Sequence, residues 1–376
     1  MPGMNFTLSS HPFGNSGMHV YMIVGLFIGA AIVLLTMTYI LDDPSQKEGW
    51  STSSTGMTAT ENRPAPRRLN FLSKSFGVLW IVDGIFQMRD AMPSQFVASI
   101  INPSFSLAPY PFKEVESLAQ GLWNLAPVKA DLGTALIQIT IGCGVFFLKT
   151  GKAWRAVVKA SIIWSAMIFV FGNGFGLFYQ GANLATGAPS AILLYTFASA
   201  EMLKLSKVED NASSTRRTGF YLGIFITLGT LLSALPVEKF WTPNGYSQMI
   251  STMAESQQPS FISHLLQSGA SMVRDQGAYI NGAMIIAGVI VALLLALSPA
   301  RRSTVVITSA FALIIWVFIQ DFGVFSPTGT DFNSGLPLLI ITISLLFPES
   351  SEVKSSYIDG ERLIGLQHKL QYDVKL

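Results

Sequence analysis

The acidic residue best placed for chemistry is Asp83, which stands in the apolar stretch LWIVDGIFQM. In a membrane helix beginning near Lys74, its carboxyl would lie roughly 13 Å deep, near the bilayer midplane. A carboxylate there costs about 2.5–3.5 kcal/mol on insertion scales. Gln87 and Asp90 follow at helical spacing, so the three would form a polar stripe. Two interpretations stay open: a proton relay or hydrogen-bond partner for a polar head group such as a quinone, or a packing contact with Asp83 neutral or bonded to Gln138 or the backbone.

A cluster of His and Met residues near the N-terminus offers a second kind of chemistry. His11, Met18, His19 and Met22 carry imidazole and thioether groups, which suit copper. His19 and Met22 are three residues apart and would share a helix face. However, the segment has no dense Met-x-Met or His-x-His array, and its composition is more typical of residues at a membrane surface. Copper binding is therefore the weaker interpretation.

The remaining motif searches argue against a self-contained enzyme. The sequence has no dinucleotide fingerprint, P-loop, zinc-protease or nucleophile-elbow motif. One cysteine, Cys143, excludes an internal disulfide and a CxxC pair. No predicted span carries a His at depth that could hold haem. We expect no covalently bound cofactor and no nucleic-acid partner, and no catalytic residue set can be assigned.

The composition is that of a polytopic, all-α membrane protein. Only 12% of the 376 residues are charged, against about 25% in soluble domains, and the mean hydropathy is +0.46. A span needs about 20 mostly apolar residues. The sequence predicts nine spans, near 19–41, 74–92, 132–149, 155–172, 188–204, 218–236, 279–298, 303–323 and 336–348.

The distribution of Lys and Arg predicts the orientation. With the N-terminus outside, 19 of the 24 Lys and Arg residues fall in the cytoplasmic segments and 5 remain outside. Cytoplasmic loops carry this excess in membrane proteins. We therefore expect a multi-pass protein of the plasma membrane, with its N-terminus outside and its C-terminus in the cytoplasm.

Two Gly-rich turns point to an internal repeat. In each, a Trp-containing apolar helix runs into Phe-Gly, a polar turn follows, and Gly-x-Pro opens the next helix. Asn and Asp favour such turns by bonding their own backbone. Irregular backbone at membrane depth is tolerated only when buried or lining a cavity, so the turns are either tight connectors or an outer-face site. The residues concerned are Asn173, Gly174, Gly176, Gly181, Asn183 and Gly187 in the first copy, and Asp321, Gly323, Gly329, Asp331, Asn333 and Gly335 in the second.

The repeat divides the chain into five parts. These are an outer segment with the first span (1–41), a polar cytoplasmic linker (42–71), two four-helix repeats (72–206 and 217–348) and a cytoplasmic tail (349–376). An even number of spans in each unit makes the two copies parallel. A long outer loop in each copy contains an amphipathic segment, EVESLAQGLWNL or FISHLLQSGASMV, expected to lie along the membrane surface.

Such a unit, with LWIVDGIFQM in its first helix and FGNGFG…GANLATGAP before its last, resembles the DoxX/DoxD-like membrane proteins, here present twice. Known members include the membrane subunit of a thiosulfate:quinone oxidoreductase, so the resemblance implies a respiratory or redox-associated component. The second copy departs at its first helix, where Leu235 stands near the place of Asp83. Any role for that acid would be confined to the first copy.

These observations favour an integral membrane subunit of a redox complex, mainly a scaffold, with a quinone or lipid site near the outer face. Its expected partners are other membrane subunits and lipid. A transporter is the alternative, although only Asp83, Gln87 and Gln138 lie at depth to line a path. An outer-face copper protein and a complete quinone-dependent enzyme are further alternatives with less support in the sequence.

Overall fold

The computed structural model describes residues 67–102, 112–173, 183–207, 212–235, 239–256, 258–325 and 329–347. These residues form helices and turns, with no strand among them. The predicted first span (19–41), the linker to residue 66 and the tail from 348 lie outside the described residues. The all-helical class is confirmed for the described part of the chain.

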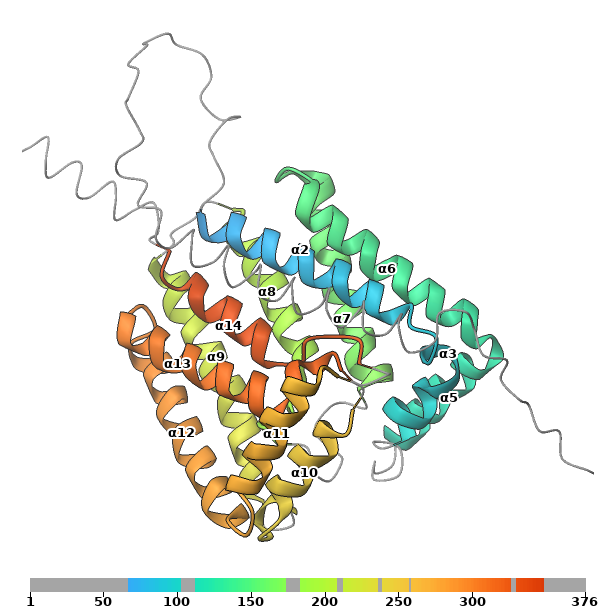
Figure 1. The fold of residues 1–376 in the computed structure, drawn as a ribbon. Helices are drawn as coiled ribbons and strands as arrows, with labels where there is room; N and C mark the ends of the chain where they lie inside the picture. The colour runs from blue at the N-terminus through green and yellow to red at the C-terminus, as the bar shows by residue number, and fades with distance from the viewer. Residues whose placement is uncertain are drawn as a thin grey trace, which may run out of the picture.

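The helices occur in the same order in the two halves of the described chain (Figure 1). The first half contains α2 (Arg67–Gln87), α3 (Met92–Phe96), the π-helical turn η2 (Val97–Ile101), α5 (Phe112–Leu125), α6 (Pro127–Phe147), α7 (Lys152–Met167), the π-helical turn η3 (Ile168–Gly172) and α8 (Ala191–Leu205). The second half contains α9 (Ala212–Ala234), η4 (Lys239–Trp241), α10 (Gly245–Ala254), α11 (Ser260–Met272), α12 (Gly277–Leu297), α13 (Arg302–Ile314), the π-helical turn η5 (Ile315–Ile319), η6 (Asp321–Gly323) and α14 (Gly335–Ser344).

Six helical stretches in the described residues are long and apolar enough to cross a membrane, rather than the nine predicted from the whole chain. They are Arg67–Gln87, Pro127–Phe147, Lys152–Gly172, Ser214–Ala234, Gly277–Leu297 and Arg302–Ile319. The predicted spans 188–204 and 336–348 are the shorter helices α8, of 15 residues, and α14, of 10 residues. Both are short because the preceding Gly-rich turn occupies part of the path that a full helix would cover.

The helices pair in the same way in each half. In the first, α2 packs on α6 and α7 on α8, and in the second α9 packs on α12 and α13 on α14. Small residues allow the closest approach: a Cβ on Gly142 of α6 would lie 2.7 Å from the carbonyl oxygen of Gly77 in α2. Such contacts are how helices pack when the surrounding solvent is as apolar as their side chains.

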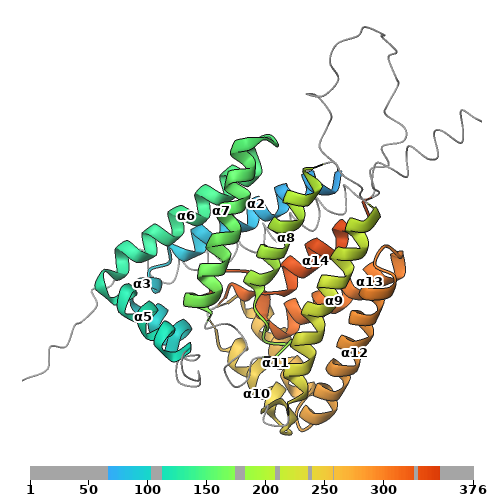
Figure 2. The same ribbon diagram turned by 180° about the vertical axis from the view of Figure 1, so that it is seen from behind.

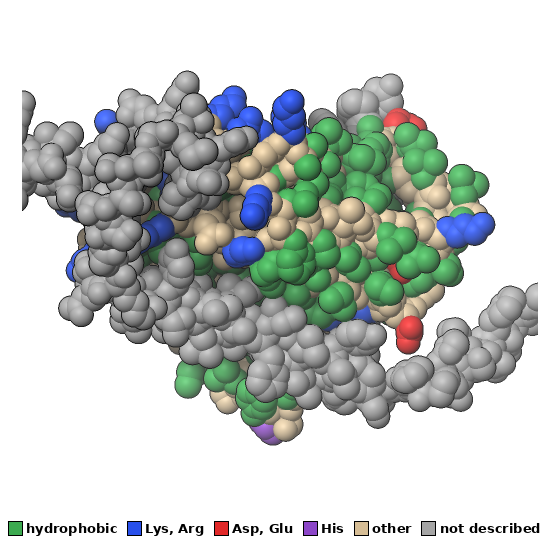
Figure 3. Space-filling view, turned by 90° about the horizontal axis from the view of Figure 1, so that it is seen from above, with side chains coloured by type: hydrophobic (Ala, Val, Ile, Leu, Met, Phe, Trp, Pro, Cys, Tyr) green, Lys and Arg blue, Asp and Glu red, His purple; other side chains and the backbone are tan. Residues whose placement is uncertain are grey.

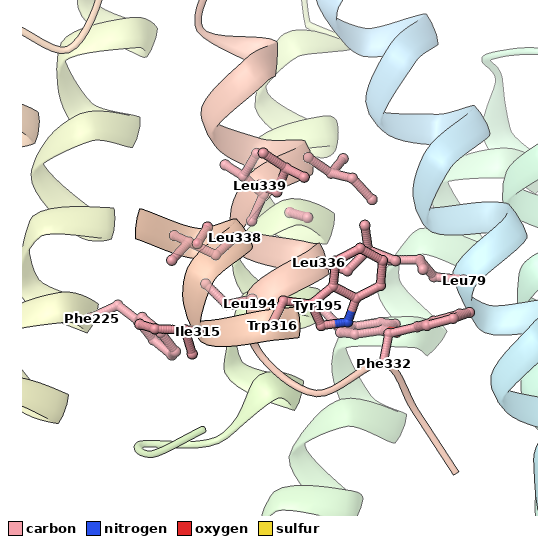
Figure 4. Close-up of a cluster of buried hydrophobic side chains, with 14 of the residues drawn as sticks. Leu79, Leu194, Tyr195, Phe225, Ile315, Trp316, Phe332, Leu336, Leu338 and Leu339 are labelled. Atoms are coloured by element: carbon pink, nitrogen blue, oxygen red, sulfur yellow. The ribbon is translucent and has the colours of Figure 1, made fainter. Parts of the chain in front are cut away.

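The hydrophobic core lies around α14, in the middle of the molecule. Leu336, Leu338 and Leu339 are at most 3% exposed, and they lie among side chains from α2, α8, α9 and η5 (Figure 4). Trp316 and Phe332 close the core at the turn that precedes α14. The short inner helix is therefore surrounded by protein, whereas α6, α7 and α12 expose apolar side chains on the outside.

A buried Arg side chain joins the two halves at the end of the molecule where α2 begins. The Arg68 guanidinium lies 3.7 Å from the Glu201 carboxylate, with the two side chains 2% and 1% exposed. Arg68 also donates to Thr218 of α9 at 2.7 Å and to Ser344 of α14 at 3.4 Å. One side chain of the first half thus bonds to two helices of the second.

The same end of the molecule carries most of the described Lys and Arg side chains. α2, α7, α9 and α13 begin there, and α6, α8, α12 and α14 end there (Figure 1). Figure 3 looks onto this end and shows basic side chains spread across it. The amphipathic helices α3, α5, α10 and α11 lie at the opposite end (Figures 1 and 2).

Candidate functional site

A cavity lies in the wedge between α6 and α7, against α2 and α8. The two helices meet at the hairpin that joins them and diverge toward the other end (Figure 2). At the hairpin the contact is tight, because a Cβ on Gly144 would lie 2.7 Å from the Val157 side chain. Near their other ends, α3, η2 and α5 line the wedge, and the partly open cavity has a volume of about 390 Å³. Small-molecule sites typically have volumes of about 300–1,000 Å³.

The predicted acid Asp83 lines this cavity. Its carboxyl accepts a hydrogen bond from the Tyr195 hydroxyl, with an oxygen–oxygen distance of 2.6 Å. The Tyr195 ring contacts Trp80 and Phe76 edge-on, at 4.9 and 5.3 Å between centroids. Asp83 is 4% exposed and Tyr195 1%. The hydrogen-bond partner of Asp83 is thus a tyrosine of α8, and not Gln138 or a backbone group.

Three buried polar atoms on the cavity-lining residues have no hydrogen-bond partner within the structure. They are Oδ1 of Asp83, Oε1 of Gln138 and Nε1 of Trp164. Buried polar groups are nearly always hydrogen-bonded, so each unpartnered atom needs an explanation. The residues that line this one cavity thus carry both acceptors and an N–H donor without partners, a set that fits a ligand with polar groups on an apolar body.

Gln87 and Asn173 also line the cavity, in different ways. Gln87 donates from Nε2 to Oδ1 of Asp131 at 2.8 Å, which ties the end of α2 to the start of α6. Asn173 follows the π-helical turn η3, and its N–H donates to the Ile168 carbonyl at 2.9 Å. Asp90 is exposed beyond the end of α2. Of the predicted polar stripe, Asp83 and Gln87 therefore line the cavity, and Asp90 does not.

The second half contributes Thr330 and Asp331 to the wall of the same cavity. Oδ1 of Asp331 accepts a hydrogen bond from the Asn333 N–H at 2.6 Å, which is the local turn expected of an Asp at this place. Burial raises the pKa of the Asp331 carboxyl above its usual range, and the hydrogen bond from Asn333 partly opposes that rise. Two sets of predicted residues, the midspan polar groups and the turn residues, thus meet at one site.

The two Gly-rich turns contact each other behind this wall. Gly187 has a φ of +97°, and the space where its Cβ would stand is occupied by the Asn333 side chain, so no larger residue fits. Gln320 donates to Ser334 at 2.8 Å and to the Ala185 carbonyl at 3.3 Å. Within the first turn, Oδ1 of Asn183 accepts from the Thr186 N–H at 3.0 Å. The turns therefore form one buried assembly.

The first residues of the second Gly-rich turn have a strained backbone conformation. Asp321, Phe322 and Gly323 have φ values of 46°, 58° and 77°, a conformation that non-Gly residues rarely adopt. Asp321 is 5% exposed, and its Oδ1 has no hydrogen-bond partner. Burial raises the pKa of Asp321 to about 8. Asp321 does not line the cavity described above.

Several predicted residues cannot be placed. Gly174, Gly176 and Gly181, and the copper candidates His11, Met18, His19 and Met22, lie outside the described residues. Gly329 and Gly335 lie on either side of Asp331, and Gly335 begins α14. Within the described part of the chain, no group of three or more His, Cys, Asp and Glu side chains is arranged to hold a metal ion.

Sequence reasoning missed Tyr195, Trp80, Trp164 and Asp131 as parts of the site. One signal was available for Tyr195, because a buried Tyr hydroxyl normally needs a polar partner and Asp83 is an acid predicted in the middle of a helix of the same half. Trp164 had no such signal, because Trp residues are common in membrane helices for reasons of packing and interfacial anchoring. Comparisons with protein-family models, curated proteins and solved structures find no match for this chain.

Proposed function

We propose that the protein is an integral membrane subunit of a redox-associated complex and that its cavity binds a lipid-soluble quinone. The observation that carries the proposal is the aromatic cavity of about 390 Å³ lined by Asp83, Gln138 and Trp164, each of which has a buried polar atom without a partner. The resemblance to DoxX/DoxD-like proteins supports the redox context, and the proposal includes a partner subunit that supplies the electrons.

The polar atoms of the cavity fit both redox forms of a quinone. A quinone presents two carbonyl acceptors, which the Trp164 N–H and the Gln138 amide can serve as donors. A quinol presents two hydroxyl donors, for which Oδ1 of Asp83 and Oε1 of Gln138 are acceptors. The Asp83–Tyr195 hydrogen bond fixes the carboxyl against the cavity wall. It thereby positions an acid–base group next to the ring oxygen that gains or loses a proton.

The orientation of the protein forms part of the proposal. The six long helices, the matching helix order and the basic end in Figure 3 support two parallel four-helix units after an N-terminal span. Lys and Arg favour the cytoplasmic side, so the basic end faces the cytoplasm. The cavity, near the opposite ends of α6 and α7, then opens on the outer half of a plasma membrane, with the N-terminus outside.

A transporter is supported less well by the same geometry. Transport needs a polar path between the two sides, and the cavity at Asp83 and the ion pair at Arg68 lie at different depths along α2. Fifteen residues of α2 separate them, or roughly 22 Å. Leu72, Phe76 and Leu79 lie between, and each is 0% exposed. These large buried side chains separate the two polar groups along α2 and favour a site that opens on one side.

The test is purification from native membranes in a mild detergent. We expect a stoichiometric partner that carries a redox centre, together with about one quinone per chain after solvent extraction. An Asp83→Leu variant should keep the partner and lose the quinone, because it removes the cavity carboxyl and leaves the partner surface intact. A monomer that contains neither partner nor quinone would contradict the proposal.

A further inference from the structure

The cavity has an apolar neighbour on the outer surface of the same wedge. A groove of about 440 Å³ runs between α6 and α7. Its walls are Leu136, Ile137, Thr140 and Ile141 on α6, and Ala160, Ile163 and Trp164 on α7. Leu136 is 54% exposed and Ile163 64%. These two side chains face the surroundings, which is lipid if α6 and α7 span a membrane.

Trp164 belongs to both spaces, because it lines the groove and also the cavity. Its buried Nε1 has no partner. On α6 the two spaces are lined by alternating residues of the same turns: Thr134 and Gln138 lie on the cavity, and Leu136, Ile137 and Thr140 lie on the groove. The indole of Trp164 and this stretch of α6 are therefore the partition between them.

The cavity has polar residues in its wall, whereas the groove is almost wholly apolar. An amphiphile has a polar head group and an apolar tail in the same way. Asp83, Gln87, Gln138, Asn173 and Asp331 make the cavity polar on one side. Among the groove residues only the Thr140 hydroxyl and the indole N–H are polar. A head group in the cavity needs hydrogen-bond partners, and its tail needs apolar surface. The partly polar cavity and the apolar groove lie in the same wedge between α6 and α7.

We propose that the α6–α7 groove holds the apolar tail of the ligand whose head group occupies the cavity, and that the ligand reaches the cavity sideways from the bilayer past Trp164. The inference rests on the proposed function and narrows the ligand class to a quinone with a long isoprenoid tail. Because burying the apolar tail away from water is favourable, a seated tail raises affinity over that of the head group alone.

The test compares two probes in lipid nanodiscs: a ubiquinone with a single isoprene unit and a ubiquinone with a long isoprenoid tail. Quinone bound per chain is measured by gel filtration, extraction and chromatography. Ile163→Trp fills the groove from α7, and Leu136→Trp fills it from α6. The matched control is Ile286→Trp on α12, because Ile286 is also 64% exposed. Thermal melting verifies that each variant is folded.

We expect Ile163→Trp and Leu136→Trp to weaken binding of the long-tailed quinone by about tenfold or more, and to leave the short-tailed quinone within about twofold. Ile286→Trp should change neither. Unchanged long-tail binding in both groove variants would overturn the groove inference while leaving the cavity proposal intact. Equal loss of both probes would also overturn it, because the effect would then lie on the head group. Failure of the wild-type protein to bind either probe would overturn both proposals.

Discussion

The two halves of the molecule share an order of helices. They differ in what fills the space between the long helices and the amphipathic helices that follow α2 and α9. In the first half, Gln87 at the end of α2 donates to Asp131, the fifth residue of α6. In the second, Asn281, the fifth residue of α12, donates to the Ser233 carbonyl near the end of α9. The same pair of helices is therefore linked by a polar bond at the same place in each half.

Beyond that link the halves diverge. In the second half, Phe240, Tyr246 and Leu266 are at most 1% exposed and belong to the hydrophobic core. In the first half, Phe96 and Ile100 line a cavity instead. Four residues before the end of α2 stands Asp83, and four residues before the end of α9 stands Thr230, whose hydroxyl bonds to the Ile226 carbonyl within its own helix. The same order of helices is therefore tightly packed here in the second half and leaves a polar cavity in the first half.

The largest expected effect concerns the joint between the halves. Arg68→Met removes the partner of the buried Glu201 carboxylate, and an unpaired buried charge costs about 3–5 kcal/mol. We expect a large loss in the free energy of unfolding, measured in detergent by thermal or denaturant unfolding. Arg67→Met is the control, because Arg67 is exposed and surface changes typically lie within about 0.5 kcal/mol. Equal effects of the two variants would show that the buried ion pair and hydrogen bonds of Arg68 do not stabilise the fold.

Two matched tyrosines separate binding from stability. Tyr195→Phe removes a hydrogen bond to the Asp83 carboxyl, an interaction worth about 1.5–3 kcal/mol if the carboxyl is charged. Tyr246→Phe removes a hydrogen bond to the Asn281 amide, worth about 1 kcal/mol. We expect both to lower the free energy of unfolding, and only Tyr195→Phe to weaken quinone binding, by roughly tenfold or more. A similar loss of binding in Tyr246→Phe would remove the functional distinction between the halves.

A smaller effect should appear in the pH dependence of stability. The pKa of Asp321 is raised to about 8 by burial, so the folded state holds a proton that the unfolded chain releases near pH 4. Folding stability is then present at low pH and falls as pH rises from about 4 to about 8. Asp321→Asn should remove this decline and be relatively more stable at pH 8.

Asp275→Asn is the matched control for that experiment, because Asp275 also has a positive φ, 62°, and is exposed. Asn accepts a left-handed conformation about as well as Asp, so backbone strain should not change in either variant. Melting temperatures from pH 5 to pH 9 make the comparison. If the melting temperatures of the wild type and of Asp321→Asn changed with pH in the same way, folding would not be coupled to protonation of Asp321.

Much of the architecture could be read from the sequence. Low charge and long apolar stretches predicted an all-helical chain with helices that can cross a membrane, and amphipathic segments predicted α5 and α11. The two four-helix repeats inferred from the repeated Gly-x-Pro stay a prediction. The lengths of α8 and α14 could not be read, because apolar residues in the preceding turns continue the hydropathy of the helix. Leu184 and Ala185, for example, are buried although they lie in a turn.

The candidate site could be read only in part. Asp83, Gln87 and Gln138 were identifiable because polar residues in an apolar stretch are costly, and Asp331 because of its turn. Their meeting at one cavity depends on how α6 and α7 diverge, and helical periodicity carries no information on that angle. Tyr195 and Trp164 required the packing of α7 and α8 against α2 to be known.

The most direct measurement of the central claim is a titration of the purified protein with the short-tailed ubiquinone. Three samples are compared: the wild type, Asp83→Leu in the cavity, and Thr230→Val at the corresponding place in α9. The proposal predicts one saturable site per chain in the wild type and in Thr230→Val, and an affinity lower by about 10- to 100-fold in Asp83→Leu. Equal affinities in all three samples, or the absence of saturable binding to the wild type, would contradict it.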